Sequence, residues 1–212
     1  MSGSKINVAK QAIDYIKDKL HPEMILGIGT GSTVNFFIEE LKELRNNFAG
    51  AVSSSEASSR LLSENGIEVF NLNDISEIAF YIDGADEVAP NKELINGGGG
   101  AHTREKIVAS AAKEFICIVD DSKIVTKLGA FPLPVEVIPE SRSLVARRIV
   151  SMGGVPEYRA GFTTDQGNQI LDVKEIDISD PKELETLLNT IPGVVDNGIF
   201  AFNKPSVVLV SK

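Results

Sequence analysis

Short apolar runs that end in glycines or hydroxyl residues alternate with helical patterns over the first two-thirds of the chain. Five runs are expected to be strands: Met24–Ile28, Ala51–Ser53, Glu68–Phe70, Ala79–Ile82 and Phe115–Val119. Helices are expected at 5–20, from a cap at Ser32 or Thr33 to about Leu44, at Ala57–Glu64 and at Thr103–Lys113. The alternation predicts an α/β fold with a Rossmann-like open, mostly parallel sheet flanked by helices.

The character of the sequence changes after Leu128, where Gly129–Pro134 is expected to be a domain hinge. Beyond it, strands and helices are expected in the order strand-helix-strand-strand-helix, at Val135–Ile138, Leu144–Met152, Glu157–Phe162, Gln169–Val173 and Pro181–Asn189. A further strand is expected near Gly198–Phe202, and Ser206–Val210 is expected to return to the main sheet. We predict a catalytic domain of residues 1–128 plus 204–212, and a smaller α+β, ferredoxin-like lid domain of residues 129–203.

The composition, with 42% hydrophobic and 24% charged residues, is that of an ordinary globular protein. The formal net charge of -9 argues against general nucleic-acid binding, which needs a basic face. No apolar segment resembles a signal peptide or is long enough to span a bilayer. The single cysteine, Cys117, is expected to be a buried thiol in a cytoplasmic protein. The two histidines, His21 and His102, are not spaced like zinc ligands.

The segment Gly27–Thr33 reads Gly-Ile-Gly-Thr-Gly-Ser-Thr and lies between an expected strand and an expected helix. Its amide N–H groups and hydroxyls are expected to form an anion site at the helix N-terminus. A tight turn that binds nothing is the alternative. Ser32 occupies the third glycine position of a dinucleotide fingerprint, and Ser53–Ser55 follow the second strand in place of an acidic ribose acceptor. A nicotinamide cofactor is therefore not expected.

A second cluster combines acidic side chains with glycines. Asp83 and Asp86 follow the strand Ala79–Ile82, where open parallel sheets bind ligands, although such a pair also forms Asx turns or helix caps. The tract Gly97–Gly100 favours a site, because four consecutive glycines are entropically costly unless the backbone must approach a ligand. Glu105 lies at the start of the next helix, where a lone glutamate is otherwise a helix-dipole partner. The cluster indicates proton transfer on an anionic molecule.

Lys123 follows the strand Phe115–Val119 in the sequence Asp-Asp-Ser-Lys. A lysine at the carboxyl end of a strand is placed to pair with a phosphate in the same crevice. A solvated surface lysine is the alternative.

Taken together, these segments resemble ribose-5-phosphate isomerase of the A type. The resemblance covers almost the whole chain and is carried by residues 27–33, 53–55, 83–87, 97–106, 131–139, 153–159, 164–168 and 191–195. It implies interconversion of D-ribose 5-phosphate and D-ribulose 5-phosphate in the pentose phosphate pathway, through a cis-enediolate. It also implies a homodimer or homotetramer that needs no metal or organic cofactor.

By motif match, the resemblance makes Glu105 the catalytic base. It assigns substrate binding to Thr30, Gly31, Ser32, Thr33, Asp83, Gly84, Ala85, Asp86, Asn96, Gly97, Gly98, Gly99 and Lys123. Asp83 and Asp86 are expected to take part in catalysis by holding sugar hydroxyls, with Asp83 helping to open the furanose ring. Asn96 stands where the family commonly has lysine, so it can donate a hydrogen bond but carries no charge.

Three alternatives remain open at this point. A sugar-phosphate-sensing regulator with an isomerase-like effector domain needs a basic helix-turn-helix segment, for which this acidic chain has no spare length. Another enzyme of the broader architecture, such as a sugar-phosphate deaminase, a lactonase or an acyl-CoA transferase, fits Glu105 with Asp83 and Asp86 less well. A catalytically inactive relative gains some support from Asn96.

Overall fold

The structure is a computed structural model, and it describes residues 2–212. The chain forms two compact units. The first unit comprises Met1–Ala85, Arg104–Lys123 and Pro205–Lys212, and the second comprises Asp86–Thr103 and Ile124–Lys204. Each unit therefore joins segments that are distant in sequence.

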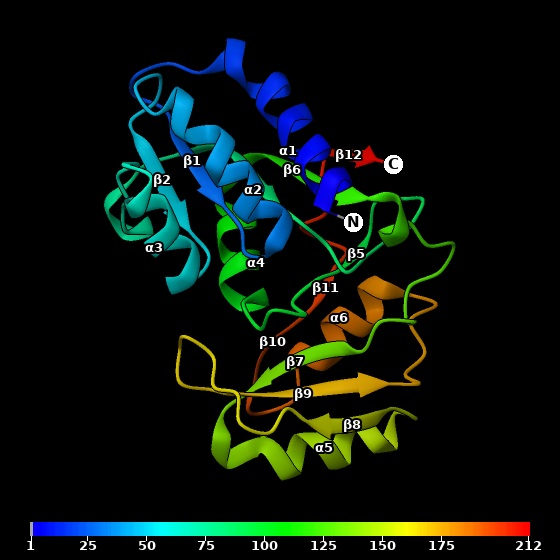
Figure 1. The fold of residues 1–212 in the computed structure, drawn as a ribbon. Helices are drawn as coiled ribbons and strands as arrows, with labels where there is room; N and C mark the ends of the chain where they lie inside the picture. The colour runs from blue at the N-terminus through cyan, green and yellow to red at the C-terminus, as the bar shows by residue number, and fades with distance from the viewer. Residues whose placement is uncertain (1) are drawn as a thin grey trace. The chain divides into compact units, whose positions relative to one another are not determined.

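The first unit is built on a five-stranded sheet in which every pair of neighbouring strands is parallel (Figure 1). In spatial order the strands are β12 (Val207–Ser211), β6 (Ala112–Asp120), β3 (Ile78–Asp83), β1 (Ile25–Ile28) and β2 (Gly50–Ser53). The central strands are almost entirely buried, as continuous apolar runs in a parallel sheet should be. This confirms the predicted Rossmann-like fold class.

Helices cover both faces of this sheet. They are α1 (Ser2–Ile16), α2 (Ser32–Leu41), α3 (Glu56–Glu64) and α4 (His102–Ala111), of which α4 begins in the second unit. The adjacent helices α1 and α2 form the main core with Leu26 and Ile28 of β1. Gly27 lies between these two residues and points to the opposite face, where it meets Val108 of α4.

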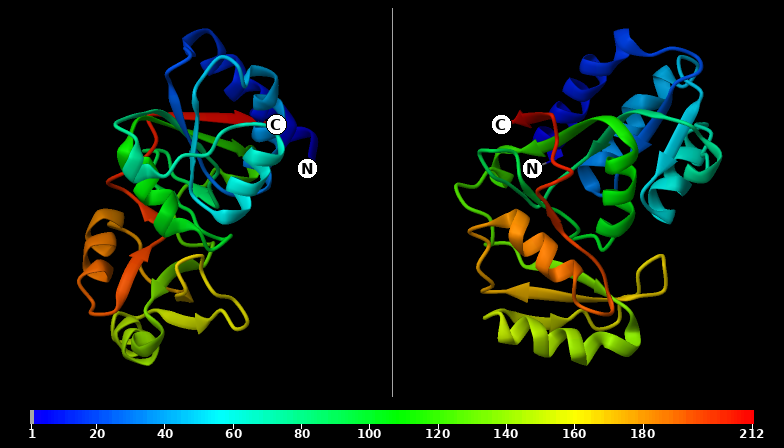
Figure 2. Two further views of the ribbon diagram at one scale, coloured as in Figure 1. Left: turned by 90° about the vertical axis from the view of Figure 1, so that its left-hand side faces the viewer. Right: turned by 180° about the vertical axis from the view of Figure 1, so that it is seen from behind.

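The second unit contains a four-stranded antiparallel sheet of order β10-β7-β9-β8 (Figure 2). Its elements follow in the order β7 (Leu133–Val137), α5 (Arg142–Ser151), β8 (Val155–Tyr158), β9 (Gln169–Lys174), α6 (Pro181–Asn189) and β10 (Val194–Asn197). This is the ferredoxin-like arrangement, and both helices share one apolar core with β7 and β9. A separate small sheet joins β11 (Ile199–Phe200), β5 (Leu94–Ile95) and β4 (Glu87–Val88).

Short 3-10 helices occur at Lys17–Lys19, Lys42–Leu44, Leu72–Asp74, Asp121–Lys123 and Pro139–Ser141. Across residues 2–212, no helix combines the length and the apolar character needed to cross a membrane.

The borders of the units differ from the predicted domain borders. Residues 86–103 belong to the second unit, where β5 pairs with β4 on one side and with β11 on the other. The chain enters the second unit again after Lys123, ahead of the predicted hinge at Gly129–Pro134. The buried carboxylate of Glu87 accepts hydrogen bonds from the amides of Gly129 (2.7 Å) and Phe131 (2.6 Å), so this backbone is held inside the second unit.

Two predicted strands were wrong in detail. Glu68–Phe70 forms a single bridge, between Val69 and Ala51, because its two hydrogen bonds both go to Ala51. The strand near Gly198–Phe202 pairs with β5 in the small sheet, and β10 is the fourth strand of the ferredoxin-like sheet instead.

Candidate active site

The turn between β1 and α2 presents the N-terminus of a helix to solvent (Figure 1). Gly31 is the N-cap, contrary to the prediction of Ser32 or Thr33, and no side chain of the described residues caps this helix. Gly31 has a φ of 130°, which favours glycine, and both Gly31 and Ser32 are exposed. The first-turn amides of Ser32 and Thr33 and the helix dipole are thus arranged as in helix N-termini that bind anions.

Lys5 adds a positive charge to this helix N-terminus. Lys5 lies in α1, and its Nζ atom donates a hydrogen bond of 2.7 Å to the hydroxyl of Ser32. This role of Lys5 was not predicted from the sequence, because 27 residues separate the two partners and a lysine on an amphipathic helix resembles any solvated lysine. The local sequence offers no signal that separates Lys5 from other lysines of this helix.

Lys123 lies in the 3-10 helix Asp121–Lys123, directly after β6. A hydrogen bond from the Ser122 hydroxyl holds the pKa of Asp120 below its usual value, and the charges of Lys123 and Lys5 act in the same direction. Both lysines are thus close enough to influence one carboxylate at the carboxyl end of β6. Two cations therefore stand at this edge of the parallel sheet.

Asp83 ends β3 and is fully buried. Its Oδ1 atom accepts hydrogen bonds from the amides of Thr30 (3.1 Å) and Gly84 (2.7 Å), and its Oδ2 atom accepts one from the Tyr81 hydroxyl (2.6 Å). A Cβ atom on Gly29 would lie 2.0 Å from Oδ1, so only glycine allows this approach. Asp83 therefore fixes the position of the turn between β1 and α2.

Serines that follow β2 hold the same turn from the other side. The Thr30 hydroxyl lies 2.8 Å from the hydroxyls of both Ser54 and Ser55. Ser55 caps α3 by accepting from the amide of Ser58, whose own hydroxyl donates to the Gly29 carbonyl at 2.7 Å. The serines that stand in place of an acidic ribose acceptor thus hold the turn before α2.

Glu105 lies in the first turn of α4 and is only 2% exposed. Burial raises the pKa of Tyr81 well above its usual value, and the charges of Asp83 and Glu105 raise it further. Tyr81 is therefore a neutral hydrogen-bond donor, and two of the three carboxylates predicted to be catalytic, Asp83 and Glu105, act on it. The sequence analysis did not single out Tyr81, because an aromatic residue in a buried strand resembles any core residue.

Close packing and two polar contacts position α4. A Cβ atom on Gly27 would lie 2.8 Å from the Val108 side chain, so glycine lets α4 approach β1. Arg104, beside Glu105, forms an ion pair of 2.8 Å with Glu56 of α3. At the start of the helix, the hydroxyl of Thr103 donates to the buried carboxylate of Glu136.

The glycine tract lies in the second unit, between β5 and α4. Gly97 and Gly100 have φ values of 107° and 81°, and the Gly100 amide donates to the Gly97 carbonyl at 2.8 Å. The carboxylate of Asp86 accepts the Gly98 amide at 2.7 Å. Gly99 is exposed, and no described atom outside its chain neighbours lies within 4 Å of the position of a Cβ on it. The tract is a tight turn that leaves the backbone open at Gly99.

The predicted residues thus divide between the units. The first unit holds Thr30, Gly31, Ser32, Thr33, Asp83, Gly84, Ala85, Glu105 and Lys123, and the second holds Asp86, Asn96, Gly97, Gly98 and Gly99. Asn96 follows β5 and is 6% exposed. In the part of the chain that the structure describes, no three histidine, cysteine, aspartate or glutamate side chains gather in a way that could hold a metal ion.

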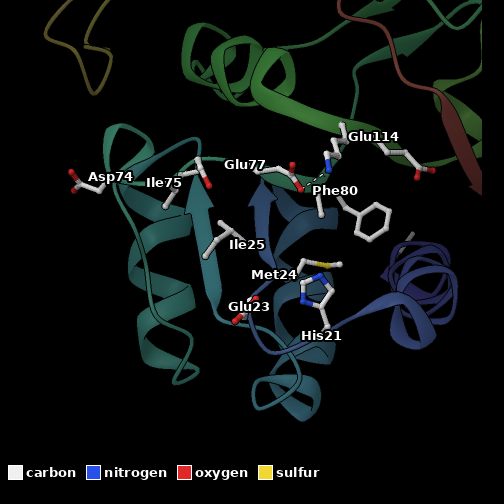
Figure 3. A pocket seen from close by; sticks show the side chains of 12 residues that line it. His21, Glu23, Met24, Ile25, Asp74, Ile75, Glu77, Phe80 and Glu114 are labelled. Atoms are coloured by element: carbon white, nitrogen blue, oxygen red, sulfur yellow. Dashed lines mark ion pairs between the residues drawn. The ribbon is translucent and has the colours of Figure 1, made fainter.

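A cavity of about 730 Å³ lies at the opposite, amino ends of β1, β3 and β6 (Figure 3). Its lining includes His21, Glu23, Phe80 and the ion pair between Lys113 and Glu77 (2.6 Å). These residues differ from the predicted site residues. Open parallel sheets bind their ligands at the carboxyl ends of the strands, where Asp83, Lys123 and the turn before α2 lie.

The family model for ribose 5-phosphate isomerase A (phosphoriboisomerase A) matches residues 50–212. The curated protein named Ribose-5-phosphate isomerase A of Legionella pneumophila (strain Corby) is 56% identical over 211 residues, which cover 100% of this chain and 96% of that protein. The counterpart of the same name from Mannheimia succiniciproducens is 57% identical over 203 residues, covering 95% and 91%.

Solved structures agree with these matches. The crystal structure of ribose 5 phosphate isomerase A from Neisseria gonorrhoeae has a TM-score of 0.92 at 46% identity and covers 99% of this chain and 94% of that one. A D-ribose-5-phosphate isomerase in complex with phospho-erythronic acid has a TM-score of 0.88 at 37% identity, with 97% and 93% covered. The α/β fold and these likenesses define an isomerase. More narrowly, the chain belongs to the ribose 5-phosphate isomerase A family, which confirms the resemblance seen in the sequence.

Proposed function

We propose that this chain interconverts D-ribose 5-phosphate and D-ribulose 5-phosphate. The observation that carries the proposal is the 56% identity, over 211 residues, with a protein named Ribose-5-phosphate isomerase A. The helix N-terminus at Gly31 and the buried Glu105 supply the two groups that such a reaction requires, an anion site for the phosphate and a base. As a metabolic isomerase it acts in the non-oxidative pentose phosphate pathway, in the cytoplasm and as a homodimer or homotetramer.

Glu105 is the proposed base. Isomerisation removes a proton from C2 of the open-chain aldose and delivers one to C1. Both carbons lie on one face of a planar cis-enediolate, so one carboxylate can serve both steps. Glu105 suits this role because its helix is held by Thr103 and by close packing at Gly27.

The glycine tract is the proposed donor set for the enediolate oxygens. Preorganised amides aimed at a developing negative charge give the largest stabilisation in many enzymes. Gly99 is exposed, and the turn around it is fixed by Asp86 and by the bond between Gly100 and Gly97. Phospho-erythronic acid, which is bound to a related isomerase, carries a planar carboxylate whose two oxygens mimic those of the enediolate. Asn96 is a further hydrogen-bond donor to the sugar.

Asp83 and Asp86 are the proposed partners of the sugar hydroxyls, and Asp83 is assigned to ring opening. Their hydrogen bonds to Thr30, Gly84 and Gly98 mean that each carboxylate also holds a backbone segment proposed to bind substrate. Substitution at either position therefore affects geometry as well as proton transfer. Asp83→Asn should separate these effects, because substrate supplied in open-chain form should rescue only a ring-opening defect.

The phosphate anchor is proposed to combine the first-turn amides of α2 with the ammonium groups of Lys5 and Lys123. A hydrogen bond from a charged donor contributes about 1.5–3 kcal/mol. We therefore expect Lys5→Met and Lys123→Met each to raise KM for ribose 5-phosphate about tenfold or more, and to weaken competitive inhibition by inorganic phosphate in parallel.

Lys10→Met is the matched control for the phosphate anchor. Lys10 lies in the same helix as Lys5 but is exposed and 3.8 Å from Glu40, so its loss should leave KM unchanged. An unchanged KM in both the Lys5 and Lys123 variants would remove these lysines from the anchor.

The proposed function itself is tested by incubating the purified chain with ribose 5-phosphate and a chelator, and by following ribulose 5-phosphate. Turnover under these conditions would support the substrate, the reaction and independence of metal together. No turnover by a folded protein, with or without added divalent cations, would favour the catalytically inactive relative that Asn96 left open. If the chain leaves ribose 5-phosphate unchanged but converts an amino-sugar phosphate, it is a different enzyme of this architecture.

A further inference from the structure

The guanidinium of Arg159 reaches the glycine tract from the loop after β8. Its Nη1 atom donates to the carbonyl of Gly98 at 3.1 Å. Its other edge forms a two-point ion pair with Asp172 of β9, with Nε–Oδ2 at 2.8 Å and Nη2–Oδ1 at 2.5 Å. The side chains of this pair are 19% and 23% exposed, so the pair is only weakly screened by solvent. Arg159 is therefore a rigid, charged contact on the backbone of the tract.

Two further features fit Arg159 to this contact. The guanidinium carbon lies 5.3 Å from the centre of the Phe162 ring, within the range of a cation–π interaction. A Cβ atom on Gly100 would lie 2.2 Å from Phe162 and 3.3 Å from Nη1 of Arg159. Glycine at position 100 thus leaves the space that both side chains occupy.

The contact determines the direction of one peptide group. In a trans peptide, the C=O of one residue and the N–H of the next point in opposite directions. No cis peptide occurs among the described residues, so the N–H of Gly99 points away from Arg159. Gly99 is also the exposed member of the tract. Arg159 therefore holds the carbonyl end of a peptide whose amide belongs to an exposed residue.

The charge of Arg159 also strengthens that amide as a donor. A cation on the carbonyl oxygen polarises the peptide, which makes its N–H more positive. Asn96, at the start of the tract, has no charge of its own. Arg159, itself paired with Asp172, brings a charged hydrogen-bond donor to the backbone of the same turn.

We propose that Arg159 is a positioning residue that orients and polarises the Gly98–Gly99 peptide, so that the Gly99 amide can donate to the enediolate oxygen. The inference rests on the proposed role of the glycine tract. It assigns to Arg159 an effect on the transition state rather than on binding of the phosphate. A purely structural Arg159, which ties β8 to β9 through Asp172, is the competing explanation.

The experiment compares Arg159→Met with the wild-type enzyme. Removing an oxyanion donor outright costs about 10²–10³-fold in kcat, so the loss of its orientation should cost about 10–10²-fold, with KM changed by less than about threefold. Inhibition by phospho-erythronic acid should weaken by the same factor as kcat/KM, whereas inhibition by inorganic phosphate should stay unchanged. A structural role predicts no such parallel with the intermediate mimic.

The control is Arg142→Met, in the same unit. The guanidinium of Arg142 lies 4.3 Å from the Tyr158 ring centre and 3.2 Å from Gln169. The substitution therefore removes a comparable cation–π contact that does not involve the glycine tract. Arg142→Met should retain wild-type kcat and inhibitor affinities.

Chemical rescue keeps the test decisive if Arg159→Met is poorly folded. In Arg159→Ala, millimolar guanidinium should restore kcat at least partly, and the same salt should leave Arg142→Ala unchanged. The inference is overturned if a folded Arg159→Met keeps wild-type kcat, or if its affinities for phospho-erythronic acid and phosphate fall equally. If the wild-type chain fails to isomerise ribose 5-phosphate, the proposed function fails instead, and that result is read before any variant is made.

Discussion

Glu105→Gln is expected to lower kcat for ribose 5-phosphate by about 10²–10⁴-fold, the usual contribution of a positioned general base. Glutamine has nearly the same shape as glutamate, so the buried side chain should keep its packing beside Tyr81. It cannot accept the C2 proton. The measurements are steady-state turnover and the exchange of the substrate C2 hydrogen with deuterated water. The exchange rate should fall by the same factor as kcat.

Glu56→Gln provides the comparison for Glu105→Gln. Glu56 pairs with Arg104, next to Glu105 on the same helix, but its side chain is 63% exposed. An exposed ion pair contributes about 0–1 kcal/mol, so this variant should keep kcat within about twofold. Near-normal turnover in Glu105→Gln with unchanged substrate binding would mean that another group is the base.

Gly29→Ala is expected to disrupt both the fold and the activity, although it adds a single methyl group. The new Cβ atom would lie 2.0 Å from Oδ1 and 2.1 Å from Cγ of Asp83. Overpacking costs about 1–3 kcal/mol, and a buried polar group that loses its partner costs about 1–3 kcal/mol more. We expect the free energy of unfolding to fall by about 3 kcal/mol and kcat/KM by about 10²-fold, because Asp83 holds the Thr30 amide.

Urea denaturation followed by far-ultraviolet circular dichroism gives the unfolding free energy of Gly29→Ala. The matched variant is Gly3→Ala in α1, where no described atom outside its chain neighbours and the backbone of its own helix lies within 4 Å of the added Cβ. That change should be neutral or slightly stabilising, because alanine favours a helix more than glycine does. Equal stabilities of the two variants would contradict the steric argument at Gly29.

Much of the parallel sheet could be predicted from sequence because each central strand is buried on both faces. Such strands must be apolar throughout, as Phe115–Val119 is, and they end where polar residues such as Asp83 begin. The carboxyl ends of the strands then indicate the site without knowledge of any contact. This is why Asp83 and the turn before α2 could be proposed from the strand pattern, whereas the role of Glu105 came from the family resemblance of residues 97–106.

The remaining features depend on contacts between distant residues. β4, β5 and β11 have two residues each, too few for a periodic pattern, and pairing across the chain defines them. The bond from Lys5 to Ser32 and the contact of Arg159 with Gly98 span 27 and 61 residues. Nothing in the local sequence of either cation distinguishes it from a surface residue.

The strand order of the first unit has a consequence for how the protein is made. β6 lies between β3 and β12, and β12 comes from Val207–Ser211, after nearly all of the second unit has been translated. While the ribosome is still producing residues 124–204, one edge of β6 lacks its final partner strand, β12. The backbone groups and apolar side chains at this edge of β6 are then exposed. The incomplete sheet is therefore exposed to aggregation until residues 207–211 have been translated. Cells low in chaperones should accordingly yield less of this enzyme.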